Sequence, residues 1–365
     1  MQGMRRTGTI AALLTLLFAG SAVAALYSKE LPRVSVVRPD DANLRFIGHW
    51  DESRASEQAV TVNTGSRILC GFTGHSVHAL FGTEGITSPA GIYVSIDGGA
   101  PSFYRVDRNE IGFTPTALRG ARHRLEIDVK DIDEAPNRWI PPLNSALSFK
   151  GLVLDRGAKT LPVAAPGGIK MEFYGDSITQ GNALLFSSLR PEASDGTKDY
   201  AFLMALAFGA IHNQIGFGRQ GVIRDGAGNV PPAPASFGWN YQGSPADPDF
   251  IPGVVIVNQG SNDVAFPAER FEPVYRDYIR QIRGAYPQAW ILCLRPFGGY
   301  HEADVKSAAE SLADVRVVYV DTTGWLRASD YTDGVHPTAQ GHARAAEKLT
   351  EVVTRCTGFQ PVPRR

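Results

Sequence analysis

The chain has 365 residues, of which 43% are hydrophobic and 20% are charged. This length and composition are typical of a globular protein with two domains or one large domain. Because the formal net charge is −1, the charge balance favours neither nucleic acid nor an anionic membrane as a partner. The composition leaves the oligomeric state open.

The first residues have the three parts of a secretory signal peptide. A pair of arginines forms a positive segment, residues 10–18 are apolar, and residues 22–24 are small. The apolar run is shorter than the ~20 residues that span a bilayer. We therefore expect a signal peptide over residues 1–24, cleaved after Ala24, and a secreted or periplasmic protein without a membrane span.

Residues 34–155 have the pattern of a β-sandwich. In one run Leu125, Ile127 and Val129 alternate with charged residues, which predicts a strand with one buried face and one solvent-exposed face. Glycine and proline separate many such short runs, and no long helical pattern interrupts them. The predicted strands are residues 59–63, 68–72, 77–81, 92–96, 103–106, 122–129 and 147–154.

A linker rich in proline and glycine over residues 156–168 precedes a different pattern in residues 169–356. Short apolar runs there alternate with helix-like stretches, which predicts a parallel, doubly wound α/β sheet. In such sheets ligands bind beyond the carboxyl ends of the strands. The predicted strands are residues 169–174, 213–217, 254–258, 291–294 and 315–320, and the predicted helices are residues 200–208, 270–285, 303–312 and 339–354.

Three polar motifs follow predicted strands of this second region. Ser177 lies in Gly-Asp-Ser, Asn262 in Gly-Ser-Asn-Asp, and Asp333 and His336 in Asp-Gly-Val-His. A serine hydroxyl needs a base within hydrogen-bond reach, which His336 can supply, and Asp333 can orient the imidazole. The Ser177 N–H, the Asn262 amide and a glycine N–H can stabilise an oxyanion. These residues predict a serine hydrolase.

Each motif also has an ordinary structural explanation. Ser177 and Asn262 can cap helices or turns, and His336 can be a loop residue before the last helix. Asp176 and Asp263, beside the motifs, are expected to bind loop N–H groups. The order of the three motifs, each after an apolar run, favours the catalytic interpretation.

The chain contains three cysteines, Cys70, Cys293 and Cys356, so at least one is unpaired in a monomer. We expect all three to act as small buried hydrophobic residues. No cysteine and histidine cluster has metal-ligand spacing, so neither a metal site nor cysteine catalysis is expected.

The motifs resemble the Ser, Gly, Asn and His blocks of the GDSL/SGNH hydrolase superfamily. The glycine of the second block matches Gly218 or Gly221; Gly218 precedes an arginine, as in several members, and is preferred, although the spacing leaves the choice open. Like that superfamily, the chain lacks the Gly-x-Ser-x-Gly elbow of α/β-hydrolases.

Residues 45–50, 92–98 and 152–155 also resemble segments of family 2 carbohydrate esterases. The resemblance implies an N-terminal jelly-roll β-sandwich followed by a flavodoxin-like SGNH domain with a parallel five-stranded sheet. It further implies removal of O-acetyl groups from carbohydrates, as by acetylxylan esterases, without a cofactor.

Aromatic side chains are candidates for stacking on sugar rings or, equally well, for packing. They are Trp239 and Tyr241, in a long segment over residues 224–248 that is expected to form an active-site loop, and Trp325. Two other functions stay open at this point. One is a lipid or thioester hydrolase on the same scaffold, and the other is a non-catalytic carbohydrate-binding protein.

Overall fold

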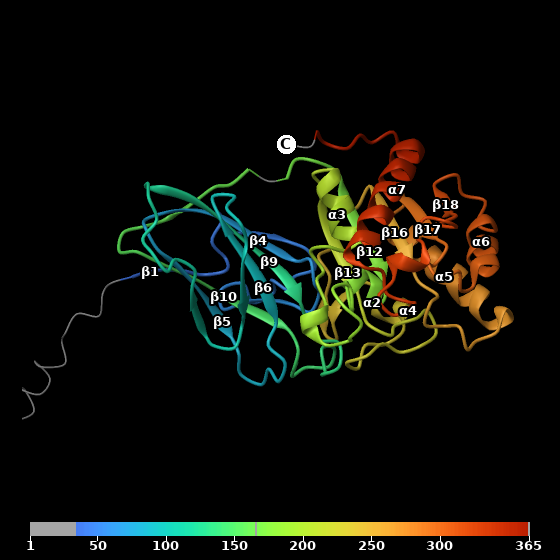
Figure 1. Cartoon of the computed structure of the whole chain (residues 1–365), viewed down its shortest axis with the longest axis horizontal. Helices are drawn as coiled ribbons and strands as arrows, with labels where there is room; N and C mark the ends of the chain where they lie inside the picture. The colour runs from blue at the N-terminus through green and yellow to red at the C-terminus, as the bar shows by residue number, and fades with distance from the viewer. Residues whose placement is uncertain (1–33, 165, 364–365) are drawn as a thin grey trace, which may run out of the picture.

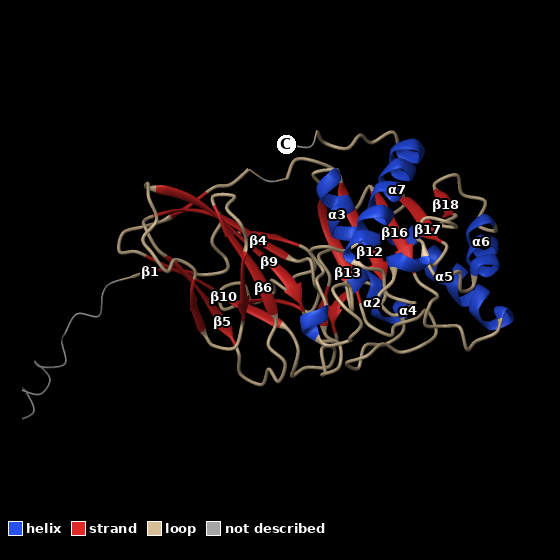
Figure 2. Ribbon diagram, in the orientation of Figure 1, coloured by secondary structure: helices blue, strands red, loops and turns tan. Residues whose placement is uncertain are grey.

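The structure is a computed structural model that describes residues 34–164 and 166–363. The predicted signal peptide lies outside the described residues. The described chain begins with a region of β-strands and continues into a region of alternating strands and helices, and the two regions lie side by side (Figures 1 and 2). None of the described helices is long and apolar enough to cross a bilayer.

The first region consists of two antiparallel sheets. The strand order is β1-β10-β5-β8 in one sheet, where β3 also pairs with β10, and β11-β4-β9-β6-β7 in the other, where β2 also pairs with β4. The region fits the predicted β-sandwich, and its jelly-roll order stays a prediction. The strands are β1 (Ser35–Val37), β2 (Arg45–Ile47), β3 (Ala59–Thr61), β4 (Arg67–Thr73), β5 (Val77–Gly82), β6 (Gly91–Ile96), β7 (Ser102–Arg105), β8 (Glu110–Gly112), β9 (Arg122–Asp131), β10 (Leu147–Leu154) and β11 (Thr160–Leu161).

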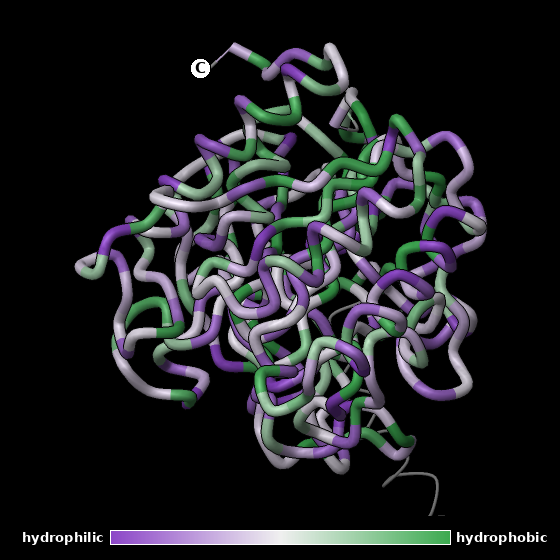
Figure 3. Tube along the Cα trace, turned by 90° about the vertical axis from the view of Figure 1, so that its right-hand side faces the viewer, coloured by the Kyte–Doolittle hydropathy of each residue, from purple (hydrophilic) through white to green (hydrophobic). Residues whose placement is uncertain are grey.

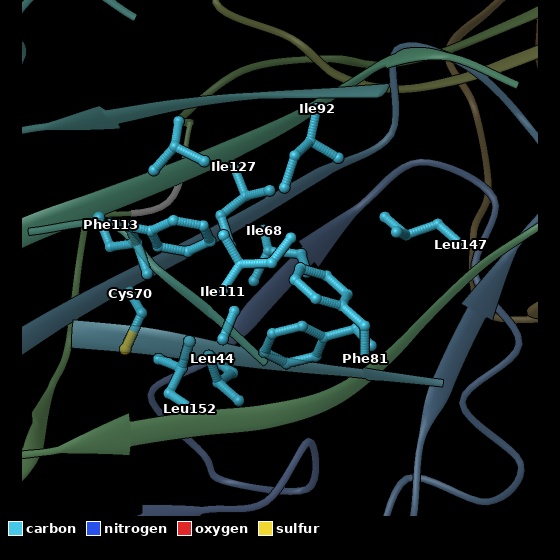
Figure 4. Close-up of a cluster of buried hydrophobic side chains, with 14 of the residues drawn as sticks. Leu44, Ile68, Cys70, Phe81, Ile92, Ile111, Phe113, Ile127, Leu147 and Leu152 are labelled. Atoms are coloured by element: carbon cyan, nitrogen blue, oxygen red, sulfur yellow. The ribbon is translucent and has the colours of Figure 1, made fainter. Parts of the chain in front are cut away.

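Apolar side chains from both sheets form one core between them. Ile68 and Ile127 come from β4 and β9 of one sheet, and Phe81 and Leu152 come from β5 and β10 of the other (Figure 4). The alternation predicted around Leu125 and Ile127 is confirmed, because the apolar residues of β9 are buried in this core. Strand β11 lies inside the predicted linker, where it pairs with β4.

The second region is built on a parallel sheet with the order β13-β12-β16-β17-β18. This is the flavodoxin-like order, in which the second strand lies on one side of the first and the later strands follow on the other side. The predicted parallel sheet of five strands is therefore confirmed. Its strands are β12 (Lys170–Gly175), β13 (Ile211–Gly216), β16 (Val254–Asn258), β17 (Trp290–Leu294) and β18 (Val317–Val320), and a hairpin outside the sheet contains β14 (Trp239–Tyr241) and β15 (Ser244–Pro245).

Helices cover both faces of this sheet. The face with Phe173 and Ile256 packs against α3 and α7, and the face with Val255 and Cys293 packs against α5 and α6. Strands buried on both sides need near-continuous apolar runs, which is the pattern in the sequence. Apolar stretches run largely through the body of this end of the molecule (Figure 3). The helices are α2 (Ser177–Gln180), η1 (Pro191–Ala193), α3 (Tyr200–Ala207), α4 (Ala233–Ser236), α5 (Ala268–Ala285), α6 (Glu302–Glu310), η2 (Ala328–Asp330) and α7 (Ala339–Thr357).

The cysteines are free thiols. Cys70 and Cys293 are buried, as predicted, whereas Cys356 near the end of α7 is only half-buried. Burial raises the pKa of the Cys70 and Cys293 thiols to about 12, so neither is a thiolate at neutral pH.

One charged group inside the parallel sheet makes stability depend on pH. Glu172 in β12 is buried, and burial raises its pKa to about 7, although hydrogen bonds from Tyr286, Asn213 and Tyr174 oppose the shift. In the unfolded chain this carboxyl has its ordinary pKa of 4.5. Between these two values the folded state holds the extra proton, so stability falls as pH rises and the loss is complete above the folded pKa.

We therefore expect Glu172→Gln to remove this pH dependence. At pH 8 the variant should be more stable than the wild type by on the order of 2–3 kcal/mol, and at pH 4 the difference should vanish. Urea unfolding at both pH values measures it. A variant that is equally destabilised at both pH values would show that the carboxylate contributes hydrogen bonds worth more than its burial costs.

Candidate active site

Ser177 lies where the first strand of the parallel sheet turns into a short helix. Strand β12 ends at Gly175, Asp176 caps α2 by accepting a hydrogen bond from the Ile178 N–H at 2.9 Å, and Ser177 is the first residue of the helix. A Cβ atom at Gly175 would lie 2.0 Å from the Thr179 hydroxyl oxygen, so the close turn requires glycine. The turn directs Ser177 beyond the carboxyl edge of the sheet.

Ser177, His336 and Asp333 form a continuous line of hydrogen bonds. The Ser177 Oγ lies 2.9 Å from His336 Nε2, and His336 Nδ1 lies 2.8 Å from Asp333 Oδ2. Ser177 and His336 are each only 8% exposed. The arrangement has the geometry of a nucleophile, a base and the carboxylate that orients the base.

The loop that carries His336 is held by Asp333 as well. Asp333 Oδ1 accepts the N–H groups of Val335 at 3.0 Å and His336 at 2.8 Å. Partial burial alone would raise the pKa of Asp333, but these hydrogen bonds and the contact with the imidazole hold it below its usual range. The carboxylate therefore stays ionised across neutral and mildly acidic pH, where it can stabilise an imidazolium.

Asn262 follows β16 and reaches the same edge of the sheet. Its Nδ2 donates to Asp176 Oδ2 at 3.2 Å and to the Gln220 carbonyl at 3.1 Å. Burial raises the pKa of Asp176 to about 6, against the opposing effect of the Ile178 N–H and of His336. Asp176 thus fixes both the helix that begins at Ser177 and the amide of Asn262.

The two glycines considered for the oxyanion site both have other partners. The Gly218 N–H donates to Gln180 Oε1 at 2.9 Å, and the Gly221 N–H donates to the Arg224 carbonyl at 3.0 Å. Arg219, between them, has a left-handed backbone with φ of 62°. In the described part of the chain, the N–H groups of Arg219 and Ser177 make no hydrogen bond.

Asp263 has the structural role that the sequence indicated. Its carboxylate accepts the N–H groups of Val222, Ile223 and Arg224 at 2.8–3.1 Å. Since Asp263 is fully buried, these bonds replace the water that it gives up. They fix the loop after β13 against the segment after β16.

These residues surround a pocket of about 90 Å³. It is lined by Glu134, Asp176, Ser177, Ile178, Leu189, Arg219, Ser261, Asn262, Val335 and His336. Glu134 comes from the β9–β10 loop (residues 132–146) of the first region, so both regions form the pocket. Leu189 and Val335 are about two-fifths exposed and supply an apolar rim.

The aromatic side chains predicted to contact substrate lie outside this pocket. The Tyr241 hydroxyl donates to Asp51 of the first region, and Trp239 is on the same hairpin. Trp325 packs against the core beneath α7 and borders a different hollow with Tyr319. Packing was the alternative that the sequence left open for them, and contact with a bound sugar stays a prediction.

The segment over residues 224–248, predicted as an active-site loop, also has a structural role. It contributes no residue to the pocket. Instead it packs on the β9–β10 loop, where Arg138 N–H donates to the Gly228 carbonyl at 3.0 Å and Gln242 N–H donates to the Trp139 carbonyl at 3.0 Å. Its glycines and aromatic residues thus join the two regions.

The sequence motifs missed three residues that line the pocket. Glu134 lies in a loop of the β-region, far from the motifs, and its neighbour Arg138 is fully buried. Arg219 follows the predicted glycine directly, and Leu189 lies in the loop after α2. The charged residues of the β9–β10 loop were the available signal, because acidic and basic residues rarely become buried without a partner.

Residues 173–344 match the model of the GDSL-like Lipase/Acylhydrolase family. The match lies within the second region of the chain. The match confirms the predicted resemblance and an ester hydrolase at the level of the family.

The GDSL-like region and the β-region together also resemble known carbohydrate esterases. A curated relative, the cellulase/esterase CelE of Acetivibrio thermocellus, is 25% identical over 233 residues, which are 58% of this chain and 28% of that relative. This chain thus matches less than a third of that protein's length.

Two solved structures extend the resemblance in fold over both regions. A family two carbohydrate esterase from Cellvibrio japonicus has a TM-score of 0.75 at 19% identity, covering 90% of this chain and 99% of that one. An acetyl xylan esterase, Est2A, from Butyrivibrio proteoclasticus has a TM-score of 0.72 at 17% identity, covering 89% and 99%. At this identity the two structures establish the shared fold.

Within residues 34–164 and 166–363, no group of three histidine, cysteine, aspartate or glutamate residues is placed to hold a metal ion. Independence from metals and cofactors remains a prediction. The hydrogen-bonded line from Ser177 to Asp333 activates a hydroxyl by proton transfer, which needs neither.

Ser177→Ala and His336→Ala should each lower the rate of ester hydrolysis by roughly 10⁴-fold or more, and the double variant should be no worse than either single variant. The reason is that the hydroxyl and the imidazole act in the same proton transfer. Initial rates on p-nitrophenyl acetate measure the effect, and circular dichroism controls for folding. Losses that multiply in the double variant would contradict a shared step.

Asn262→Ala should lower kcat by ~10²–10³ with little change in KM, because an oxyanion donor acts on charge that develops in the transition state. Steady-state kinetics separate the two constants, and thermal unfolding controls for the lost contact with Asp176. If KM rises while kcat holds, Asn262 contacts the bound substrate instead.

Proposed function

We propose that this chain is a secreted serine esterase that removes O-acetyl groups from carbohydrates through an acyl-serine intermediate. The observation that carries the proposal is the hydrogen-bonded line from Ser177 through His336 to Asp333. The presence of a nucleophile, a base and an orienting carboxylate argues against a purely carbohydrate-binding protein, because binding alone does not need an activated hydroxyl. The printed functions of the similar proteins, cellulase/esterase and acetyl xylan esterase, support a carbohydrate ester as substrate.

In the proposed reaction, Ser177 Oγ attacks the acetyl carbonyl carbon while His336 Nε2 takes the hydroxyl proton. The bond from the carbonyl carbon to the sugar oxygen then breaks, and that oxygen receives the proton from His336. Water attacks the acetyl-serine in the second half, again giving its proton to His336. Acetate leaves, and the Ser177 hydroxyl is restored.

Three donors are proposed for the oxyanion. The Ser177 N–H is free because the first N–H groups of a helix have no partner within it. The Asn262 amide can join if it turns from the Gln220 carbonyl. For the third we propose the N–H of Arg219 in place of Gly218 or Gly221, because both glycine N–H groups are already bonded.

The size of the pocket favours a short acyl group. Its volume is about 90 Å³. Sites for drug-sized ligands are several times larger, at roughly 300–1,000 Å³. An acetyl group fits in this pocket beside Ser177, whereas a long acyl chain would extend out of the pocket.

One observation favours a second candidate, a hydrolase of lipid or thioester substrates. Leu185, Phe186 and Leu189 of the loop after α2 are each about 40–50% exposed, and Val335 on the rim is 40% exposed. A long acyl chain that leaves the pocket would run over these apolar side chains. The chain length of the preferred acyl group separates the two functions.

We expect p-nitrophenyl acetate to be hydrolysed with a kcat/KM roughly 10-fold or more above that of the octanoate, since a small pocket rejects added methylenes. The wild type, but not Ser177→Ala, should also release acetate from an acetylated xylan or glucomannan. A maximum at octanoate or longer, with no acetate released from any acetylated glycan, would favour the lipid hydrolase instead.

Secretion belongs to the same proposal. The charged, apolar and small-residue segments at the start of the chain support it, and an acetylated polysaccharide is met outside the cell. N-terminal sequencing of protein collected from the culture medium or periplasm would test the expected cleavage after Ala24.

A further inference from the structure

Glu134 is the one acidic side chain of the β-region among the residues that line the Ser177 pocket. Its side chain is only 4% exposed. The β9–β10 loop that carries it is anchored to the GDSL-like region by Arg138, whose Nη2 donates to Gln180 Oε1 at 2.7 Å. The position of Glu134 in the pocket is therefore set by the same contact that holds the two regions together.

The GDSL-like region leaves room for this carboxylate beside the nucleophile. A Cβ atom at Gly218 would lie 1.6 Å from Glu134 Oε2. Glycine at this position therefore lets the carboxylate pack directly on the backbone that precedes Arg219. The pocket beside Ser177 therefore accommodates the Glu134 carboxylate, which comes from the β-region.

The known partners of the carboxylate leave part of its bonding capacity unused. Oε2 accepts from Asn182 Nδ2 at 2.6 Å, and the side chain of Asn182 is itself held by the Ser194 hydroxyl at 3.3 Å. Oε1 lies 3.6 Å from Arg219 Nε, which is an ion pair but longer than a hydrogen bond. A carboxylate has about four lone-pair sites, so Oε1 can accept further donors from the pocket.

We propose that Glu134 Oε1 accepts a hydrogen bond from a sugar hydroxyl next to the ester, and so selects esters of polyhydroxylated alcohols. The inference rests on the proposed function and names the group that recognises the leaving alcohol. Hydroxyl donors form short, strong bonds to carboxylates. An alcohol without a neighbouring hydroxyl would leave this buried oxygen with only its long ion pair to Arg219, and sites that hydrogen-bond a substrate hydroxyl discriminate strongly against analogues that lack it.

The charge of Arg219 makes this arrangement compatible with catalysis. A lone carboxylate beside Ser177 would oppose the negative charge that develops on the carbonyl oxygen. The guanidinium of Arg219, 3.6 Å from Oε1, offsets that charge, while its exposed position leaves the carboxylate oxygen free to accept.

The test compares Glu134→Gln with wild type on matched acetates. The substrates are mono-acetylated methyl glycosides of xylose, glucose and mannose, each with free hydroxyls beside the ester, together with cyclohexyl acetate and p-nitrophenyl acetate, which have none. Glutamine keeps the size and can still accept from Asn182 Nδ2, but it replaces the charged acceptor. Glu192→Gln on the exposed turn η1 removes one negative charge nearby and is the matched control.

We expect Glu134→Gln to lower kcat/KM for the preferred glycoside acetate by roughly 10-fold or more. This loss should be at least about 10-fold larger than any change in its kcat/KM for cyclohexyl acetate and p-nitrophenyl acetate, whereas Glu192→Gln should match the wild type on every substrate. Circular dichroism controls for folding. An equal loss on all substrates would show that Glu134 only supports the pocket, and an unchanged preference would show that it does not contact the alcohol; either result overturns the inference. A wild type that cleaves the two simple acetates but no glycoside acetate would overturn the proposed function, and this inference with it.

Discussion

The buried amide of Gln180 is the contact on which the arrangement of the site depends. Its oxygen accepts from Arg138 of the β-region and from the Gly218 N–H, and its nitrogen donates to the Ile132 carbonyl at 2.8 Å. Because a buried amide that loses its partners costs about 1–3 kcal/mol per group, these segments are fixed relative to one another. Ser177 is one helical turn earlier, so this contact also fixes the nucleophile.

The same contact brings opposite charges close to the pocket. Arg138 is fully buried, and burial lowers its pKa to about 10 even though Glu134 and Asp133 oppose the shift. It stays charged at neutral pH, where its guanidinium carbon lies 4.8 Å from the centre of the Phe217 ring. Arg138 and Arg219 both place positive charge near Glu134, which offsets part of the cost of burying its carboxylate.

The sequence predicted the parts of the fold that repeat a local pattern. Short apolar runs bounded by turn residues, such as Val254–Asn258, favour buried strands, and the Asp333 to His336 spacing places two polar groups on one short loop. The oxyanion site was harder to predict. Whether Gly218 has a free N–H depends on Gln180, and nothing local to the glycine shows that its N–H is already bonded.

The contribution of the β-region to the pocket left only a weak signal in the sequence, the charged residues of the β9–β10 loop. Glu134 reaches the pocket through a loop whose position depends on contacts with two distant segments, around Gln180 and Gly228. The role of Trp239 and Tyr241 was hard to predict for the related reason that a Gly- and Pro-rich segment can either border a site or lie between two regions. Local composition does not distinguish these two roles, because both need irregular backbone.

The shared pocket has a consequence for how this protein can be divided. Cutting the chain between β11 and β12 would separate two stretches that each have their own apolar core. The hydrolase half would then expose Gln180 and Gly218 to water and lack one wall beside Ser177. The module that can be transplanted is therefore the pair of regions, because an isolated GDSL-like half would carry the nucleophile without the Glu134 wall of its pocket.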